Sequence, residues 1–376
     1  FSDILGDNQL FTSLFLNGDI QDFGGTLAYV NRKNRIAWGA SFSHVPFRTG
    51  QYGFIDTVSL QTNTGESVLT AQYALDLTRI FEDRVGVFAQ LPFSQTLRLE
   101  AGAAYSLYYS RTTRYSDYFL TDGQTVFNSL VFQDRQRLNP DEVFGVPVFQ
   151  GQVASINAAL VGDNSVFGFA SPLQGQRYRI GLERSFNGFG TSQNLGDFNF
   201  WTVTADYRKY FRLKPVTLAV RAMHTGRYGP GANSLFPNYL GQPWFIRGYE
   251  FNAANQILND NGRSINDLLG SKLLVSNIEL RIPFTGPKQL ALISSKFLLT
   301  ELSFFVDGGL AWDSFAELTP TDGGSGIGSW ATQPVFSAGA SMRVNLFGSL
   351  IVEPYYAFPL QQNTRGVFGL NFIPGW

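Results

Sequence analysis

Cysteine is absent from the 376-residue sequence. Disulfide bonds, thiolate zinc sites and cysteine nucleophiles are therefore excluded, because all three need a thiol group. The absence also agrees with passage of the chain through an oxidising compartment. Histidine occurs only twice, which leaves little material for a metal site or a histidine-based catalytic centre. We accordingly expect no metal, no cofactor and no catalytic residues.

Long apolar runs are absent as well. A membrane-spanning helix needs about 20 mostly apolar residues, and no window of the sequence approaches that length without polar interruption. Neither sign of charge is in excess, because 28 Lys and Arg residues stand against 29 Asp and Glu residues. This balance gives no electrostatic reason to expect nucleic acid as a partner.

Aromatic residues are abundant instead, with 35 Phe and 16 Tyr in the chain. The mean hydropathy of -0.05 is too polar for a bundle of membrane-spanning helices. A membrane β-barrel fits this mixture, because half of each strand faces lipid and the other half faces a polar interior. A chain that crosses a bilayer without helices must do so as a closed sheet, since open strand edges cannot be satisfied in lipid.

Alternation of apolar and polar residues supports this interpretation. From Thr96 to Ser110, every second residue belongs to an apolar set, which is Leu97, Leu99, Ala101, Ala103, Tyr105, Leu107 and Tyr109. The run from Ser67 to Thr78 has the same period of two, which indicates strands that are apolar on one face. A large soluble sandwich or propeller would also alternate. The aromatics near strand ends, the final Trp376 and the unequal loop lengths favour an all-β transmembrane barrel.

Turn residues divide the chain into about sixteen predicted antiparallel strands, an even number as expected for a single-chain bacterial barrel. The predicted strands are 8–17, 23–31, 35–46, 52–62, 67–79, 84–92, 96–110, 151–168, 176–187, 198–209, 216–228, 272–286, 298–313, 335–345, 349–359 and 366–374. Short turns such as Asn31–Arg35 and Phe93–Gln95 should lie at the periplasmic end. The long connections 111–150, 229–271 and 314–334 should be extracellular or folded into the lumen.

The first residues carry no export signal, having neither a basic stretch nor an apolar stretch. We expect residues 1–7 to be a link from a missing N-terminal periplasmic region. Residues 8–376 would then form one transmembrane β-barrel.

A charged residue inside a long loop has two candidate partners on the late strands. The segment Trp244–Tyr249 is a bulky apolar run around Arg247, and something must bury it. Alternation in the predicted strands points Glu279 and Asp307 toward the lumen. A carboxylate in a narrow, partly dehydrated lumen is costly unless paired, and a guanidinium can offer it bidentate hydrogen bonds. Arg247 is the candidate partner once its loop folds back inside.

These segments resemble the signatures of a known family. The sequence IRGY at 246–249 resembles the (V/I)RG(F/Y) motif in the sixth extracellular loop of the outer-membrane assembly and translocation superfamily. That superfamily, which contains the bacterial surface antigen family, includes BamA, TamA and the two-partner secretion transporters. The stretch FVDGG at 305–309 resembles its FxDxG, and NIELRIP at 277–283 resembles its twelfth-strand segment. The resemblance covers about residues 151–376, and the first 150 residues match in architecture only.

By this resemblance, the loop-lock motif is Ile246, Arg247, Gly248 and Tyr249. Its partners in the lumen are Glu279, Phe305, Asp307 and Gly309. The arginine would bind the two acids, and the glycine after it would permit close approach of the backbone. The alternative is an arginine that only plugs and stiffens the barrel, since buried ion pairs are often purely structural.

The end of the chain departs from the family pattern. The expected C-terminal insertion signal, on the seam between the last and first strands, is Phe368, Leu370, Phe372 and Trp376. Pro374 stands where an aromatic residue would be usual. Since proline donates no ladder hydrogen bond, the last strand should stop pairing near Phe372. A short last strand resembles the lateral seam of this superfamily, and an ordinary closed seam stays open as the alternative.

Enzymatic interpretations find little support. Alternation places His44 and His224 with lipid-facing residues, so we expect both at the membrane interface rather than beside a nucleophile. Inward carboxylates should pair with arginines in a lumen network rather than act as a glycosidase pair. The acids are Asp76, Glu100, Glu183, Asp206 and Glu301. The arginines are Arg98, Arg177, Arg179, Arg208 and Arg221.

The resemblance implies a non-enzymatic, integral protein of the Gram-negative outer membrane that acts in insertion and assembly, or in translocation, of polypeptides. Its partners would be outer-membrane lipids, unfolded outer-membrane or secreted polypeptides, and other subunits of an outer-membrane complex. The alternative function is a plugged or passive pore, or an accessory structural barrel in a larger complex.

Overall fold

The computed structural model describes most of the chain, and its regular structure is almost entirely β-strand. The described residues are 2–3, 6–16, 20–61, 65–138, 151–188, 197–250, 265–319, 332–346, 348, 350–361 and 365–372. Nineteen strands lie in these ranges, four of which (β8, β12, β13 and β15) have two residues each. None of the helices described there is long and apolar enough to cross a membrane.

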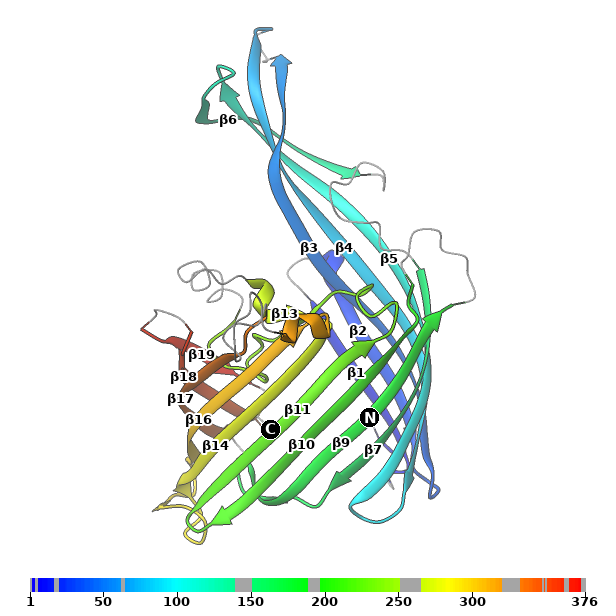
Figure 1. Cartoon of the computed structure of the whole chain (residues 1–376), viewed down its shortest axis with the longest axis vertical. Coiled ribbons are helices and arrows are strands. Elements are labelled where there is room, and N and C mark those ends of the chain that lie inside the picture. The colour runs from blue at the N-terminus through cyan, green and yellow to red at the C-terminus, as the bar shows by residue number, and fades with distance from the viewer. Residues whose placement is uncertain are drawn as a thin grey trace. The chain divides into compact units, whose positions relative to one another are not determined.

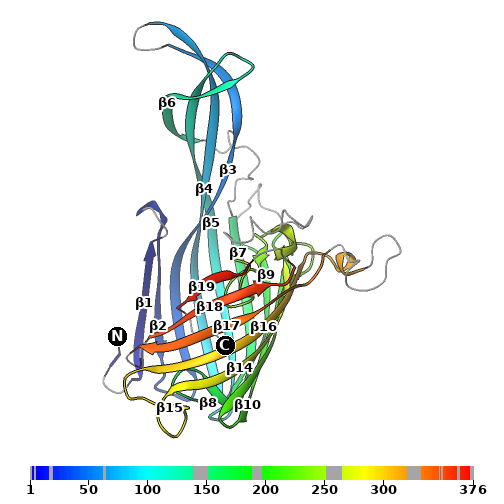
Figure 2. The same cartoon turned by 90° about the vertical axis from the view of Figure 1, so that its left-hand side faces the viewer.

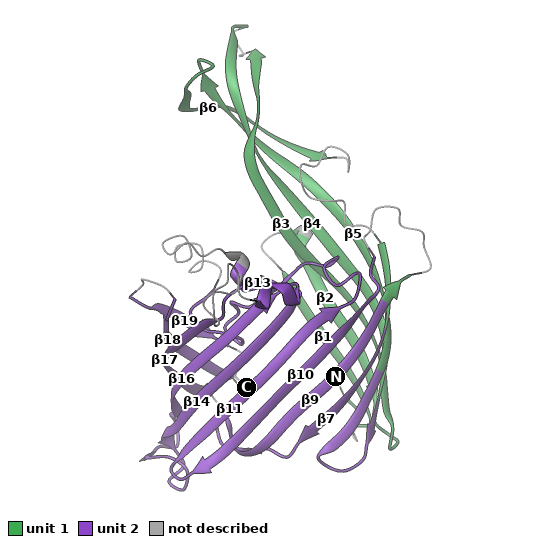
Figure 3. Cartoon of the chain, in the orientation of Figure 1, with its two compact units in different colours: residues 1–89, 102–155, 186–196 green, residues 90–101, 156–185, 197–376 purple. Residues whose placement is uncertain are grey.

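The chain divides into two compact units (Figure 3). Unit 1 comprises residues 1–89, 102–155 and 186–196. Unit 2 comprises residues 90–101, 156–185 and 197–376.

Unit 1 is built around long antiparallel strands. The strands with residues in this unit are β1 (Asn8–Leu16), β2 (Phe23–Asn31), β3 (Ala37–Gln61), β4 (Ser67–Pro92), β5 (Leu97–Thr121), β6 (Val126–Leu138) and β7 (Gly151–Asp163). The pairs β1–β2, β2–β3 and β5–β6 are antiparallel. Figures 1 and 2 show β3, β4 and β5 continuing, together with β6, well past the ends of β1 and β2.

The prediction was wrong about the boundaries of β3, β4, β5 and β6. β5 was expected at 96–110 but continues to Thr121. β3 is continuous, whereas two strands were expected there, at 35–46 and 52–62. β4 is also continuous, whereas two strands were expected at 67–79 and 84–92. Polar residues that interrupt the alternation have partners and do not turn the chain. Arg79 Nε on β4 donates to Asp22 Oδ1 of the short helix Ile20–Asp22 at 2.8 Å. His44 Nδ1 on β3 lies 2.5 Å from Asp83 Oδ1 on β4. In addition, β6 lies inside the segment 111–150 that was expected to be a connection.

Unit 2 is a more regular ladder. Its further strands are β8 (Val166–Phe167), β9 (Pro172–Asn187), β10 (Phe200–Leu213), β11 (Val216–Tyr228), β12 (Asn238–Tyr239), β13 (Leu269–Gly270), β14 (Lys272–Gly286), β15 (Ile293–Ser294), β16 (Leu299–Trp312), β17 (Val335–Leu346), β18 (Leu350–Pro359) and β19 (Val367–Asn371). The long strands pair antiparallel in the order β9–β10–β11–β14–β16–β17–β18–β19. The predicted strands in this part of the chain agree with these bounds to within a few residues.

Alternating exposure explains why these sequences form strands. On β14, Ile278 and Leu280 are exposed, whereas Asn277, Glu279 and Arg281 are buried. The same alternation runs along β16. Exposed large apolar side chains on one face are expected where that face contacts lipid, and the charged face must then be covered from the other side. The predicted all-β antiparallel fold class is confirmed.

The last strand is short. β19 ends at Asn371, one residue before the position where pairing was expected to stop. Phe368, Leu370 and Phe372 are exposed, as residues on the apolar face should be. Trp376 and Pro374 lie outside the described residues.

Candidate functional site

A loop in unit 2 follows β11 and packs against the charged face of the following strands. Two strand side chains hold its backbone. Arg221 Nη1 donates to the carbonyl of Trp244 at 2.7 Å, and Asn277 Nδ2 donates to the carbonyl of Phe245 at 2.8 Å. The backbone N–H groups of Phe245 and Ile246 both donate to the carbonyl of Gln242, which makes a tight turn just before the arginine.

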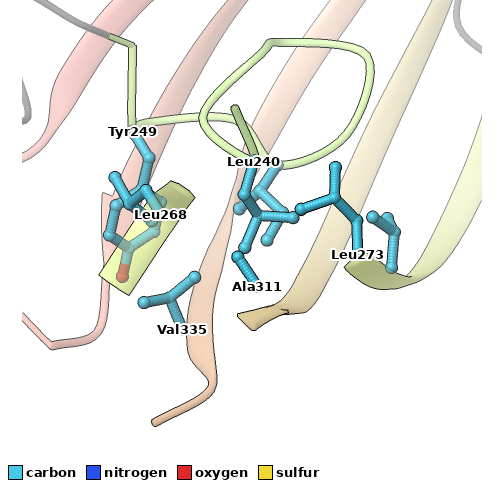
Figure 4. Close-up of a cluster of buried hydrophobic side chains, with 8 residues drawn as sticks. Leu240, Tyr249, Leu268, Leu273, Ala311 and Val335 are labelled. Atoms are coloured by element: carbon cyan, nitrogen blue, oxygen red, sulfur yellow. The ribbon is translucent and has the colours of Figure 1, made fainter. Parts of the chain in front are cut away.

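Apolar side chains bury the loop on either side of this arginine. Ile246 and Tyr249 are fully buried in one cluster. Figure 4 shows this cluster with Tyr249 labelled. The other members of the cluster are Leu240, Leu268, Leu273, Val275, Ala311 and Val335. Gly309 makes room for the cluster, because a Cβ at that position would lie 2.3 Å from Ile246 Cδ1. The apolar residues beside Arg247 are therefore the part of the loop that packs against the strands.

Tyr249 is also fixed by hydrogen bonds at both of its ends. Its hydroxyl, which has one proton to donate, lies within hydrogen-bond distance of two acceptors, the carbonyl of Phe336 at 3.0 Å and Gln361 Oε1 at 2.7 Å. Its carbonyl accepts a hydrogen bond from Tyr239 Oη at 2.5 Å. Burial, together with the negative charge of Glu250, raises the pKa of Tyr239 to about 12, so this donor keeps its proton at neutral pH.

Arg247 contacts carboxylates on three different strands. Its Nε and Nη2 donate to Asp307 Oδ2 and Oδ1, both at 2.8 Å, in a bidentate pair. Its Nη1 lies 2.8 Å from Glu279 Oε1 and 3.5 Å from Glu353 Oε1. The guanidinium also lies over the Phe305 ring, with Cζ 3.5 Å from the ring centroid, which adds a cation–π contact.

The ion pairs of Arg247 belong to a larger buried network. Arg343 on β17 contacts Glu279, Glu301 and Glu353, at distances from 2.8 to 3.2 Å. Arg281 contacts Glu279 Oε2 at 2.8 Å. All of these side chains are at most 4% exposed. Three guanidiniums thus stand against four carboxylates where little water reaches, so every charge depends on its neighbours.

Gly248 lets the loop come this close to the strands. Its φ of +93° is a conformation that residues with a Cβ rarely adopt, and an added Cβ would lie 3.0 Å from both Ala357 and Pro359 of β18. Its N–H donates to Glu250 Oε1 at 3.1 Å, and the same oxygen accepts a hydrogen bond from Tyr355 Oη. Glycine is therefore required here for both conformation and space.

The structure brings the eight residues of the expected lock and its partners into one place. Arg343 and Glu353 were not predicted from the sequence, and Glu301 was expected to pair with arginines other than Arg343. Strand parity could have shown that these residues point inward. It could not have shown their height relative to Glu279, which depends on the register between strands. The expected C-terminal signal residues are not part of this cluster.

The expected lumen network needs correction in its partners. Asp76 pairs with Arg114, and Glu301 pairs with Arg343, and neither arginine was in the expected set. Arg177 pairs with Asp163, which was not among the expected acids. Four further pairs do join expected partners, namely Glu100 with Arg98 and Arg179, and Asp206 with Arg208 and Arg221. Parity fixes the face of each residue but not its neighbour.

Both histidines have ordinary structural partners. The His44 ring lies 5.5 Å from the Phe81 ring and contacts Asp83. The His224 ring contacts the carbonyl of Leu273 at 2.9 Å and Tyr228 Oη at 2.7 Å. Within the described ranges, no group of three histidines and acids could hold a metal ion.

Comparison with known proteins identifies the family. The model of the Omp85 superfamily domain matches residues 85–372, a range that contains the whole Arg247 network. Among solved structures, BamA from Haemophilus ducreyi lacking POTRA domains 1–3 has a TM-score of 0.49 and 13% identity, covering 96% of this chain and 68% of that chain. CdiB from Acinetobacter baumannii has a TM-score of 0.49 and 11% identity, covering 97% of this chain and 53% of that chain. The chain thus spans about half the length of CdiB. A comparison with curated proteins gives no match. Because the family model covers well over half of its residues, the protein belongs to the Omp85 superfamily.

Proposed function

We propose that this protein is an integral barrel of the bacterial outer membrane that inserts, assembles or translocates polypeptides without an enzymatic step. Membership of the Omp85 superfamily supports the general role. The exposed apolar faces of its strands fit contact with outer-membrane lipids. In this proposal residues 8–376 form the barrel domain, and the residues before them link it to a periplasmic region.

The observation that carries the proposal is the position of Arg247. A loop arginine with 4% exposure contacts carboxylates of β14, β16 and β18. Burying so many charges costs free energy that an apolar plug would not cost. A network kept despite that cost favours a role in holding one defined loop position, over simple filling of space. We infer that the network holds the loop in this position so that the barrel interior keeps the conformation in which a substrate polypeptide is handled.

The substrates in this proposal are unfolded outer-membrane or secreted polypeptides, and other outer-membrane subunits are its partners. A strand edge can bind an extended polypeptide through main-chain hydrogen bonds, which makes no demand on its sequence. β19 is the candidate edge, since it pairs with β18 through only the five residues from Val367 to Asn371. An incoming strand that displaced β19 from β18 would have only the hydrogen bonds of these five residues to replace.

The test compares Arg247→Ala with Arg208→Ala. The control also removes an inward arginine from an ion pair, but Arg208 pairs with Asp206 on its own strand. Each variant replaces the native protein in its host. Folding is followed by heat-modifiable mobility on gels, and outer-membrane and secreted proteins are measured by quantitative proteomics.

We expect Arg247→Ala to fold and to lower the amounts of a subset of outer-membrane or secreted proteins severalfold, whereas Arg208→Ala leaves them unchanged. Should Arg247→Ala not fold, Arg247→Lys keeps the charge but cannot reproduce the planar contacts to Asp307, Glu279 and Glu353. Unchanged protein levels in a folded variant, with a changed conductance in planar bilayers, would overturn the proposal in favour of a plugged or passive pore.

A further inference from the structure

Unit 1 contains a cavity whose walls are rich in arginine. Its volume is about 710 Å³, and it is lined by residues that include Arg79, Arg111, Arg135, Arg137, Phe23 and Phe81. We call it the arginine cavity. It lies entirely within unit 1 and shares no residue with the Arg247 network.

Strand register explains why three of the arginines share one face. In the β5–β6 pair, Arg137 lies opposite Thr113 and Arg135 lies opposite Tyr115. Directly opposed residues of an antiparallel pair point to the same side, as do residues two apart on one strand. Arg111, two residues before Thr113, therefore faces the same way as Arg135 and Arg137. All three are exposed.

Among the residues that the structure describes, no carboxylate pairs with any of these three arginines. Arg79 pairs with Asp22 at 2.8 Å. Arg111 lies over the Phe81 ring at 5.6 Å, and Arg135 lies over the Tyr115 ring at 5.1 Å. In the part of the chain that the structure describes, no ion pair within 4.0 Å joins a carboxylate to Arg111, Arg135 or Arg137. The cavity therefore offers uncompensated positive charge beside aromatic rings.

The position of the cavity along the strands indicates what lies beside it. On the same face of the sheet, Phe42 precedes His44 on β3, and Leu107 precedes Tyr109 and Arg111 on β5. Phe42 and Leu107 are exposed apolar residues, as expected in contact with lipid. The arginines thus begin where this apolar band ends. Cations at such a border are placed to meet the headgroups of lipids whose chains contact the band.

We propose that the arginine cavity binds a phosphate group carried by a lipid headgroup of the membrane surface. Guanidinium groups offer planar bidentate hydrogen bonds to phosphate, and Phe23 and Phe81 give apolar contact for the rest of the molecule. A bisphosphorylated glycolipid of the lipid A type meets both requirements. The site goes beyond the proposed function and does not depend on it.

The test measures binding of purified lipid A to the whole protein in detergent by native mass spectrometry. The variant Arg111→Gln, Arg135→Gln, Arg137→Gln removes three charges from the cavity. The control Arg32→Gln, Lys33→Gln, Arg35→Gln removes three exposed charges from the turn between β2 and β3. Heat-modifiable mobility confirms that both fold, and Arg137→Gln alone is the milder variant should the triple variant fail.

We expect lipid A to bind about 1,000-fold more weakly to the cavity variant, since each of the three lost charge-assisted contacts is worth about tenfold. The control should bind like the unaltered protein, and lipid A stripped of both phosphates should bind poorly to all. Equal binding to the cavity variant, or to the stripped lipid, overturns the site. Displacement of lipid A by millimolar inorganic phosphate overturns the lipid source and assigns the cavity to free phosphate.

Discussion

The adjacent residues Arg247 and Gly248 make two different contributions to the site. The arginine supplies positive charge to a cluster in which carboxylates outnumber guanidiniums. The glycine supplies a backbone conformation that brings this charge within 2.8 Å of its partners. Each residue depends on the other. Without the glycine conformation, the arginine could not come close enough to neutralise the carboxylates, and without the arginine, the buried carboxylates would stay unpaired.

Gly248→Ala should test the second contribution. The substitution places a Cβ at a φ of +93° and within 3.0 Å of Ala357 and Pro359. We expect the free energy of unfolding to fall by about 2 kcal/mol, from strain and crowding together. Denaturant titration of the protein in lipid, followed by tryptophan fluorescence, measures this loss.

The matched control for this measurement is Gly65→Ala. Gly65 has a φ of +84°, but an added Cβ would meet nothing within 4 Å. It therefore reports the conformational strain alone, and we expect it to lower the free energy of unfolding by about 1 kcal/mol. Equal losses for the two variants would show that contact with β18 contributes nothing at Gly248.

The sequence is informative about single residues of the site up to a definite limit. A period of two places Glu279 and Asp307 on the inner face, and the bulky loop around Arg247 indicates that it must be buried. The same period cannot say that Glu279 lies opposite Phe305, because that depends on the register of β14 against β16. Arg343 and Glu353 were missed for this reason, although both occupy inward positions.

Among the elements, the strands of unit 2 were the easier to predict. Their ends carry clear turn residues, and buried and exposed residues alternate along most of β14 and along β16 up to Asp307. In β3 and β4 the alternation is interrupted at polar residues, and such an interruption looks like a turn in the sequence. The pairs Arg79 with Asp22 and His44 with Asp83 show that these residues are accommodated within long strands. Pairing between distant residues cannot be read from a local pattern.

The distal end of the β5–β6 hairpin should be dispensable for folding. We expect replacement of residues 119–131 by Asn-Gly to change the free energy of unfolding by only about 0.5 kcal/mol. Tyr118 and Phe132 face each other in the register, so a two-residue turn can join them. The residues of β6 up to Arg137 are exposed. On β5 the deletion removes two half-buried residues, Phe119 and Leu120, and the buried Thr121, so the loss of buried surface is confined to these three. Thermal unfolding in detergent gives the comparison.

Gly339→Ala provides a variant in which the ladder itself is disturbed. A Cβ there would lie 2.1 Å from the carbonyl oxygen of Tyr356, so β17 and β18 would have to separate. This variant should unfold at a clearly lower temperature than the shortened hairpin. A shortened hairpin as unstable as Gly339→Ala would show that the distal part of β5 and β6 supports the fold.

For the molecule as a whole, the absence of cysteine offers a direct test of its orientation in the membrane. Gln124 lies in the turn between β5 and β6, and Asn34 lies in the turn between β2 and β3; both are exposed. Short turns belong at the periplasmic end and long strand extensions at the outside. A membrane-impermeant maleimide should therefore label Gln124→Cys in intact cells, and Asn34→Cys only after the outer membrane is opened.

The two single-cysteine variants control for each other, because each is labelled under one condition and both should be labelled in detergent. Labelling of Asn34→Cys alone in intact cells would invert the orientation. Labelling of both without opening the membrane would contradict insertion of this part of the chain. The composition predicted a membrane barrel, but only such accessibility data can assign its two ends.

The guanidinium contacts described above also affect how unit 2 can deform. Arg247 on the loop and Arg343 on β17 contact acids of β14, β16 and β18, and β17 itself lies between β16 and β18. Parting any two of these neighbours would leave a charge without its counterion in a place that water scarcely reaches. We therefore expect β14, β16, β17 and β18 to move as one rigid group under lateral tension. Separation of neighbouring strands should instead occur where the strands are joined by backbone hydrogen bonds alone.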